Sequence, residues 1–240
     1  MSVNEGEAIA RQKNGRREVA RDARSKADSV YGELKEAILS GALEPGCLID
    51  KAALCEKLGV SRFPVSAAVS RLAYDGLVDV APQHGSFVSR ISLADVQERL
   101  FIRSALEGEV AAEAARRFTA EDREALKENL ARAAAAVAAE DLGEFYEFDV
   151  GFHHILTSRL GMPRTSELLD GLRVHLERAR RLMMAPPGRL REVLEEHSAV
   201  AEAIAAGDPE GAREAIRKHL GLTGRVLLKV AEQRPDMFSR

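Results

Sequence analysis

Residues 43–88 read LEPGCLIDKAALCEKLGVSRFPVSAAVSRLAYDGLVDVAPQHGSFV, and this stretch decides the fold of the first part of the chain. Asp50 is suited to cap a short helix that ends at Gly59, and Ser61 is suited to cap the next helix, which ends near Gly76. Two helices joined by a turn of four residues or fewer that contains glycine are typical of a helix-turn-helix. The pattern therefore predicts this motif.

The residues around this motif complete a small domain. Before it, apolar residues recur at helical spacing from Val30 to Leu39 and predict a first helix. After it, residues 77–80 alternate between apolar and polar side chains, and residues 82–85 carry turn signals before a second apolar stretch. A hairpin in this place is the wing of a winged helix-turn-helix, which we expect over residues 26–90.

From Ser92 onward the sequence pattern is helical. Ser92 and Asp95 resemble the start of a capping box, and further capping residues mark the later breaks. The six predicted helices span Ser92–Phe118, Ala120–Ala139, Leu142–Arg159, Arg164–Met184, Gly188–Ala206 and Pro209–Glu232. Long helices with short connections favour an antiparallel bundle. The predicted fold class is therefore mainly α, with the winged domain followed by an all-α helical bundle over residues 91–235.

The composition is that of an ordinary folded chain: of 240 residues, 45% are hydrophobic and 30% are charged. The most apolar stretch, residues 130–139, is too short for a membrane span, so we expect no membrane partner. The first thirty residues lack the apolar core of a signal peptide, and Cys47 and Cys55 alone make a disulfide framework impossible. We therefore expect a cytoplasmic protein in which both cysteines are small buried side chains.

A cluster of positive charge lies near the start of the chain. Residues 11–26 contain seven basic residues against only Glu18 and Asp22, and we treat residues 1–25 as a basic, flexible arm. One interpretation is a solvated tail. The other is an arm that contacts phosphates and adds salt-dependent affinity for nucleic acid. Both interpretations stay open at this point.

The second helix of the motif has the features of a recognition helix. Such a helix needs small or polar residues at its N-terminal end, cations near phosphates, and an apolar face that holds it on the domain. For two of the candidate DNA contacts a simpler interpretation stays open: Arg71 could be a surface charge, and His84 could be a loop histidine that contacts no DNA. The candidate DNA contacts are Ser61, Arg62, Phe63, Ser66 and Arg71 on the helix, with Gln83, His84 and Gly85 at the wing, where glycine permits a positive φ.

Several sequence blocks of this domain follow one another in a family-specific order. They are LEPG at residues 43–46, LGVSR at 58–62, PV at 64–65, RL at 71–72, GL at 76–77 and GSFV at 85–88. Together they resemble the winged helix-turn-helix of the GntR family of bacterial transcription regulators, which implies binding to a double-stranded DNA operator. Family members usually carry threonine or serine in place of Phe63 and a DNA-contacting arginine in place of Ser66. A serine cannot make the bidentate contact of a guanidinium group, so we expect a different operator or compensation by the basic arm.

A second group of residues indicates a metal site in the helical part. Asp149 and His153 are four residues apart and so share one face of a helix, while His197 and His219 fall on the predicted fifth and sixth helices of the bundle. One carboxylate and three imidazoles from three helices could hold a divalent cation and leave positions for a ligand. Taken singly, each histidine is more often a core or surface residue. His154 is an internal control, because it lies about 100° around the helix from His153.

The helical part also resembles a known domain. The blocks are RSALE at residues 103–107, FD at 148–149, FH at 152–153, EH at 196–197, AI at 203–204, GD at 207–208 and HL at 219–220. They resemble the FCD-type ligand-binding domain of the FadR branch of the GntR family. The resemblance implies that a divalent metal ion, commonly zinc or nickel, is held beside a small carboxylate effector by Asp149, His153, His197 and His219. It also implies that Arg103 pairs with the effector, whereas the alternative is a surface ion pair with Glu107.

The sequence as a whole favours a DNA-binding transcriptional regulator whose operator binding is controlled by a carboxylate bound beside a metal. The resemblance implies repression, and a homodimer is expected because one recognition helix reads only a few base pairs. The segment Phe87–Ala94 is the expected hinge between the domains. There are two alternatives. One is a metal-dependent hydrolase-like enzyme that carries a winged domain, although no general-base motif accompanies the cluster, and the other is a helical interaction module without metal.

Overall fold

The computed structural model describes residues 25–184 and 186–239, and it divides into two compact units at the boundary between Arg90 and Ile91. The predicted basic arm over residues 1–25 lies outside the described residues, apart from its last residue. Each unit has a hydrophobic core of its own. A separate core for each unit is what a domain needs to fold around its own centre.

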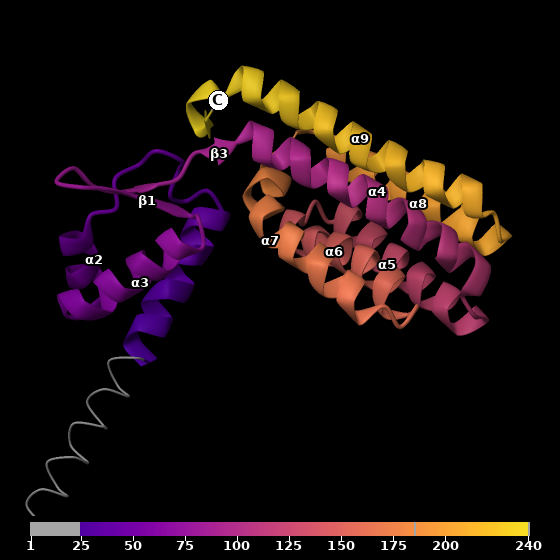
Figure 1. Ribbon diagram of the computed structural model, residues 1–240, viewed down its shortest axis with the longest axis horizontal. Helices are drawn as coiled ribbons and strands as arrows, with labels where there is room; N and C mark the ends of the chain where they lie inside the picture. The colour runs from indigo at the N-terminus through magenta and orange to yellow at the C-terminus, as the bar shows by residue number, and fades with distance from the viewer. Residues whose placement is uncertain (1–24, 185, 240) are drawn as a thin grey trace, which may run out of the picture. The chain divides into compact units, whose positions relative to one another are not determined.

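The first unit combines helices with a β-hairpin (Figure 1). Its elements are a helix that includes residues 25–39, α2 at Lys51–Leu58, α3 at Arg62–Tyr74, β1 at Val78–Ala81 and β2 at Gly85–Val88. The two strands pair antiparallel, from Val78 opposite Val88 to Ala81 opposite Gly85. The predicted winged helix-turn-helix is therefore confirmed.

The ends of α2 and α3 reflect their capping residues. The Asp50 carboxylate accepts hydrogen bonds from two backbone amides in the first turn of α2, and Gly59 ends this helix in the left-handed conformation at φ 61°. Ser61 occupies the N-cap position of α3, but its side chain makes no capping hydrogen bond. The prediction that the Ser61 hydroxyl caps the helix is therefore wrong, and this hydroxyl stays available to other partners.

The hairpin turn contains two residues with positive φ. Gly85 has φ 119°, as expected, and Gln83 has φ 64°, which is uncommon for a residue with a side chain. Gln83 and His84 are exposed in this turn. Their side chains therefore lie on the surface at the tip of the wing.

The core of the first unit is formed largely by α3 and the helix over residues 25–39. Val65 and Leu72 of α3 are completely buried, and they share one apolar cluster with Ile38 of the first helix. Cys47 and Cys55 are free thiols that pack against this cluster but are only half-buried. The prediction of buried cysteines is therefore correct only in part.

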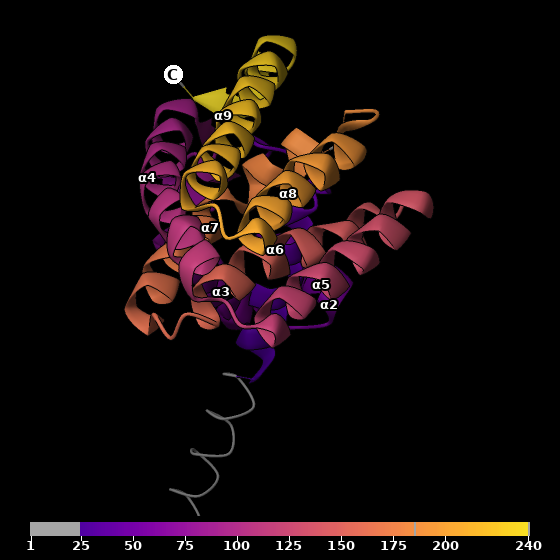
Figure 2. The same ribbon diagram turned by 90° about the vertical axis from the view of Figure 1, so that its right-hand side faces the viewer.

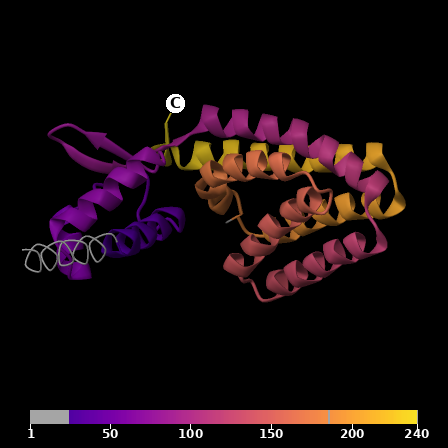
Figure 3. The same cartoon turned by 60° about the horizontal axis from the view of Figure 1, so that its bottom comes forward.

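The second unit is built from long helices that pack side by side (Figures 1 and 2). Within the described residues, its α-helices are α4 at Leu93–Arg117, α5 at Ala120–Ala138, α6 at Leu142–Ser158, α7 at Pro163–Met184, α8 at Arg189–Ala206 and α9 at Pro209–Gln233. The six predicted helices are confirmed, each to within one residue at either end. Figure 3 shows α9 running along α4. Among the described helices, none is long and apolar enough to span a membrane.

The end of the chain returns to the start of the second unit. The strand β3 at Ile91–Ser92 pairs in parallel with β4 at Phe238–Ser239, which follows the short 3-10 helix η1 at Pro235–Met237. This pairing was not predicted from the sequence. Two residues are too few for the alternation of a strand to be visible in a sequence.

The segment between the units is shorter than the expected hinge at Phe87–Ala94. The strands β2 and β3 and the start of α4 take up most of it and leave only Ser89 and Arg90 outside regular elements. The backbone amide of Ser89 donates a hydrogen bond to the carbonyl of Leu77, which ties Ser89 to the first unit. The expected hinge at Phe87–Ala94 is therefore too long, and the segment between the regular elements of the two units consists of Ser89 and Arg90.

Candidate functional site

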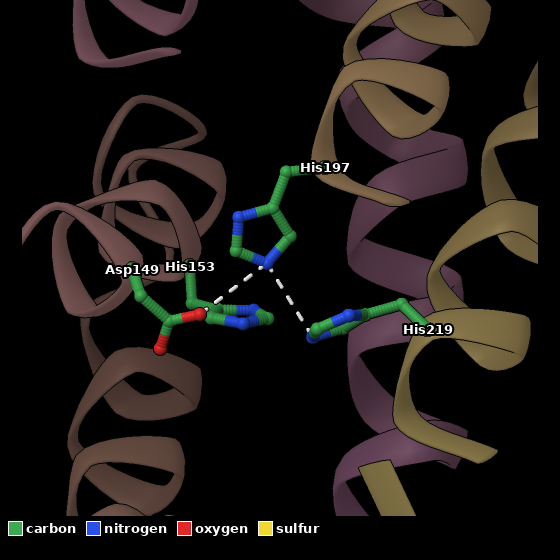
Figure 4. A group of neighbouring side chains, drawn as sticks. All are labelled: Asp149, His153, His197 and His219. Carbon is green, nitrogen blue, oxygen red and sulfur yellow. Dashed lines mark hydrogen bonds and ion pairs between the residues drawn. The ribbon is translucent and has the colours of Figure 1, made fainter. Parts of the chain in front are cut away.

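Four buried side chains from three helices of the second unit converge on one point (Figure 4). Asp149 and His153 lie one turn apart on α6, His197 comes from α8, and His219 comes from α9. None of them is more than 4% exposed, and their ligand atoms all lie within 4.8 Å of one another. The structure therefore brings the predicted cluster together, whereas the control residue His154 is exposed.

The spacing of these atoms matches that of ligands around one metal ion. His197 Nε2 lies 3.4 Å from His219 Nε2 and 3.5 Å from Asp149 Oδ1. Two atoms bound about 2.1 Å from one divalent ion lie about 3.0 Å apart at adjacent positions of a six-coordinate site and about 3.4 Å apart in a tetrahedral site. The His197 ring is held by stacking on Phe152, with the ring centroids 4.1 Å apart. Three nitrogens and one oxygen in this arrangement fit a divalent metal.

Two glutamates orient two of the imidazoles. His153 Nδ1 lies 2.6 Å from Glu107 Oε2, and His219 Nδ1 lies 2.6 Å from Glu196 Oε2. When Nδ1 donates its proton to a carboxylate, Nε2 keeps its lone pair for a metal. Both glutamates belong to sequence blocks quoted above, yet neither was assigned this role, because each lies far from its histidine along the chain.

Burial keeps the three histidines neutral. It lowers the pKa of His153 to about 3, against the opposing effect of Glu107. Burial also lowers the pKa of His197 well below its ordinary value, and the neighbouring histidines lower it further. The pKa of His219 is lowered by burial too, although Glu196 acts in the opposite direction. At neutral pH the imidazole lone pairs are therefore available to a metal.

Three buried arginines line a small cavity beside the cluster. Arg180 pairs with Asp149, and Arg189 makes two hydrogen bonds to Glu196, of 2.6 and 3.1 Å. The cavity lined by these two arginines and Arg103 has a volume of about 20 Å³, enough for about one water molecule. Among the described residues, Arg103 Nη2 and Arg180 Nη1 are buried without a hydrogen-bond partner. Only Arg103 was singled out from the sequence.

Arg103 lies in the interior of the bundle. Its Nε donates a hydrogen bond to Glu107 Oε1 at 2.6 Å, and each side chain is only 2% exposed. The ion pair proposed as the alternative is therefore present, but it is buried, which corrects the expectation of a surface pair. Burial would raise the pKa of Glu107, but the charges of Arg103 and its neighbours hold that pKa well below its ordinary value.

The predicted DNA contacts lie on the surface of the first unit. The opposite face of α3 fills the core, so its exposed face is presented outward, as a recognition helix requires. The exposed residues are Ser61, Arg62, Phe63 and Ser66 at the N-terminal end of α3, with Gln83, His84 and Gly85 at the hairpin turn.

Arg71 differs from these residues because it has partners within the first unit. Its Nη1 lies 2.6 Å from Asp28 Oδ1, and its guanidinium group lies over the ring of Tyr31, 3.9 Å from the centroid. A phosphate would have to compete with Asp28 for this side chain. The geometry therefore favours the alternative of a surface charge for Arg71.

Two family models match the chain. The model described as bacterial regulatory proteins, gntR family, matches residues 26–88. The model described as FCD domain matches residues 98–222. The first range coincides with the winged helix-turn-helix, and the second contains all four candidate metal ligands.

Relatives match most of the length of the chain. It is 29% identical over 213 residues to the HTH-type transcriptional repressor RspR of Escherichia coli (strain K12), covering 88% of this chain and 92% of that protein. It is 32% identical over 219 residues to an uncharacterized HTH-type transcriptional regulator in an unstable DNA locus of Streptomyces ambofaciens, covering 91% and 92%. The solved structure of E. coli McbR/YncC has a TM-score of 0.66 and 28% identity, covering 85% of this chain and 97% of that chain. The matching proteins are regulators rather than enzymes.

Proposed function

Because the chain belongs to the GntR family of bacterial regulatory proteins and carries an FCD domain, we propose that it is a metal-containing repressor that a small carboxylate releases from operator DNA. The comparisons with regulators give no support to the metal-dependent hydrolase considered above. One observation carries the proposal. In the domain that follows the DNA-binding domain, Asp149 and three histidines converge beside buried arginines.

Operator binding is assigned to the first unit. Arg62 is exposed in the first turn of α3, where it can reach a phosphate or a base edge, and the hydroxyl of Ser61 can donate to a phosphate. Gln83 and His84 are exposed at the tip of the wing, and we expect them to contact an adjacent groove. In a homodimer, two recognition helices would read the half-sites of a near-palindromic operator. The protein would act in the cytoplasm, where bacterial DNA lies.

Zinc or nickel is the proposed occupant of the cluster in the second unit. Neutral imidazoles and a carboxylate suit both ions, and four protein ligands leave positions open in a six-coordinate site. A bound divalent ion supplies a Lewis-acid position for an oxygen of the effector. The contacts of Glu107 and Glu196 with two of the histidines hold the donor atoms ready for the ion.

The proposed effector is a small carboxylate that lies between the metal and the buried arginines. Arg103 Nη2 and Arg180 Nη1 are buried without a hydrogen-bond partner among the described residues, and a carboxylate can accept from both. The cavity of about 20 Å³ is too small for such a molecule, so its entry requires the lining side chains to move. Met183 and Met184 belong to that lining, and methionine adapts readily. Effector binding would thus favour the conformation in which these side chains have moved over the conformation with the small cavity.

The Glu196→Gln variant is expected to bind zinc at least about tenfold more weakly than the wild type. An amide oxygen is a poorer acceptor than a carboxylate for the His219 Nδ1 proton, and loss of such a partner costs about 10–100-fold in metal affinity. Competition with a chromogenic zinc chelator measures the change. Glu195→Gln is the matched control, because Glu195 is the exposed neighbour on the same helix. An equal loss of affinity in both variants would refute the role assigned to Glu196.

Fluorescence anisotropy with the DNA upstream of the protein's own gene tests operator binding. We expect a complex that survives an excess of random-sequence DNA and weakens steeply as salt is raised, because phosphate contacts release counterions. A complex that random-sequence DNA displaces at equal concentration would contradict sequence-specific regulation at this site.

A further inference from the structure

An exposed aromatic side chain lies in the first turn of α3. Phe63 is 69% exposed, although the buried apolar residues of the same helix fill the core of the first unit. Single exposed apolar residues are common on protein surfaces. Exposure alone therefore does not show what the ring contacts, and the inference depends on the position of Phe63 and on the chemistry of its neighbours.

Phe63 projects almost directly away from the core. At about 100° per residue, the mean direction of the buried residues of α3 lies opposite Phe63 to within about 10°. Between Phe63 and the exposed Tyr74 at the C-terminal end of α3, the residues near the middle of this outward face have short side chains, namely Ser66, Ala67 and Ser70. In the N-terminal half of this face, the Phe63 ring therefore extends furthest from the helix. The short side chains beside it allow another molecule to approach the helix closely.

The neighbouring side chains identify DNA as that molecule. Arg62 lies about a quarter-turn around the helix from Phe63. Ser61, at the N-cap position, has an exposed hydroxyl that makes no capping hydrogen bond. The side chains of Arg62 and Ser61 can therefore contact phosphates. A phenyl ring cannot pair with the hydrogen-bonding groups of base edges. The apolar group that the major groove offers to such a ring is the 5-methyl group of thymine.

We infer that Phe63 reads one thymine in each operator half-site by contact with its methyl group. This inference rests on the proposed DNA-binding function, and it names the chemical group of the operator that Phe63 contacts. Contact between the ring and the methyl group removes apolar surface of both from water. Loss of the methyl group should therefore weaken binding about fourfold for each half-site.

Duplexes selected from a random library by the full-length protein supply the DNA for the test. Each thymine of the selected half-site is replaced in turn by deoxyuridine, which removes the methyl group and keeps every hydrogen-bonding group. We expect one position at which this replacement weakens wild-type binding about fourfold but leaves the affinity of Phe63→Ala unchanged. At the same position, 5-methylcytosine should bind the wild type more tightly than cytosine does, and the variant should not distinguish them.

Tyr74→Ala is the matched control, because Tyr74 is an exposed aromatic residue at the far end of the same helix. This variant should keep the wild-type response to deoxyuridine, and Phe63→Leu should keep part of it because an apolar side chain remains. The inference is overturned if Phe63→Ala responds to deoxyuridine as the wild type does, or if the wild type responds at no thymine. A wild type that selects no sequence would count against the proposed function instead.

Discussion

Replacing His153 and His197 together by alanine is expected to abolish stoichiometric zinc binding and the thermal stabilisation that zinc gives the wild type. The two residues come from α6 and α8 and are at most 2% exposed, so the change removes half of the donor set from two sides. With free metal at about 100 times its Kd, binding stabilises the folded state by about 2.7 kcal/mol. For a unit of this size, that corresponds to a rise in Tm of about 5–10 °C.

Calorimetry of the metal-free and zinc-loaded proteins, with metal analysis after dialysis, measures both effects. The His154→Ala variant is the matched control, because His154 is an exposed neighbour of His153 on the same helix. It should leave the metal content and the shift in Tm unchanged. A double variant that still holds one zinc ion per chain would contradict this metal centre, whereas a wild type that binds no zinc would favour the helical interaction module without metal.

The Arg103→Met variant is expected to lose about 3–5 kcal/mol of unfolding free energy. Glu107 is buried and negatively charged, with Arg103 at 2.6 Å and Arg173 at 3.8 Å. Removing the nearer guanidinium group leaves a buried charge that is poorly compensated. Methionine keeps an extended apolar side chain in place, which limits the loss of packing. Equilibrium unfolding in urea measures the change.

Two further variants separate the effect of charge from that of packing. Arg103→Met/Glu107→Leu removes both charges and should recover a substantial part of the loss, because apolar replacement of a buried ion pair is often neutral. Arg213→Met breaks an ion pair with Glu109 at the surface and should leave the unfolding free energy nearly unchanged. An Arg103→Met variant as stable as the wild type would contradict the structural role of the buried pair.

Most of the fold could be predicted because its signals are local. Asp50 and Gly59 mark the ends of α2 through hydrogen bonds and a backbone conformation that involve only nearby residues. Helical geometry alone places Asp149 and His153 on one face of α6. Their convergence with the histidines of α8 and α9 was expected from the resemblance to a known domain, and the structure places all four together.

The rest of the site depends on how the helices are rotated against one another. Glu107 reaches His153 from α4 to α6, and Glu196 reaches His219 from α8 to α9. Sequence spacing carries no signal for contacts of this kind, since the partners lie on separate helices. The pair between Arg71 and Asp28 was missed for the same reason.

Release of operator DNA by small carboxylates, followed by fluorescence anisotropy with and without metal, tests the proposed control of DNA binding most directly. A carboxylate pool should displace labelled operator from the zinc-loaded wild type. The same pool should leave DNA bound to the metal-stripped wild type and to the His153→Ala/His197→Ala variant. Equal release from the zinc-loaded and metal-stripped proteins would contradict control through the cluster of Asp149 and the three histidines.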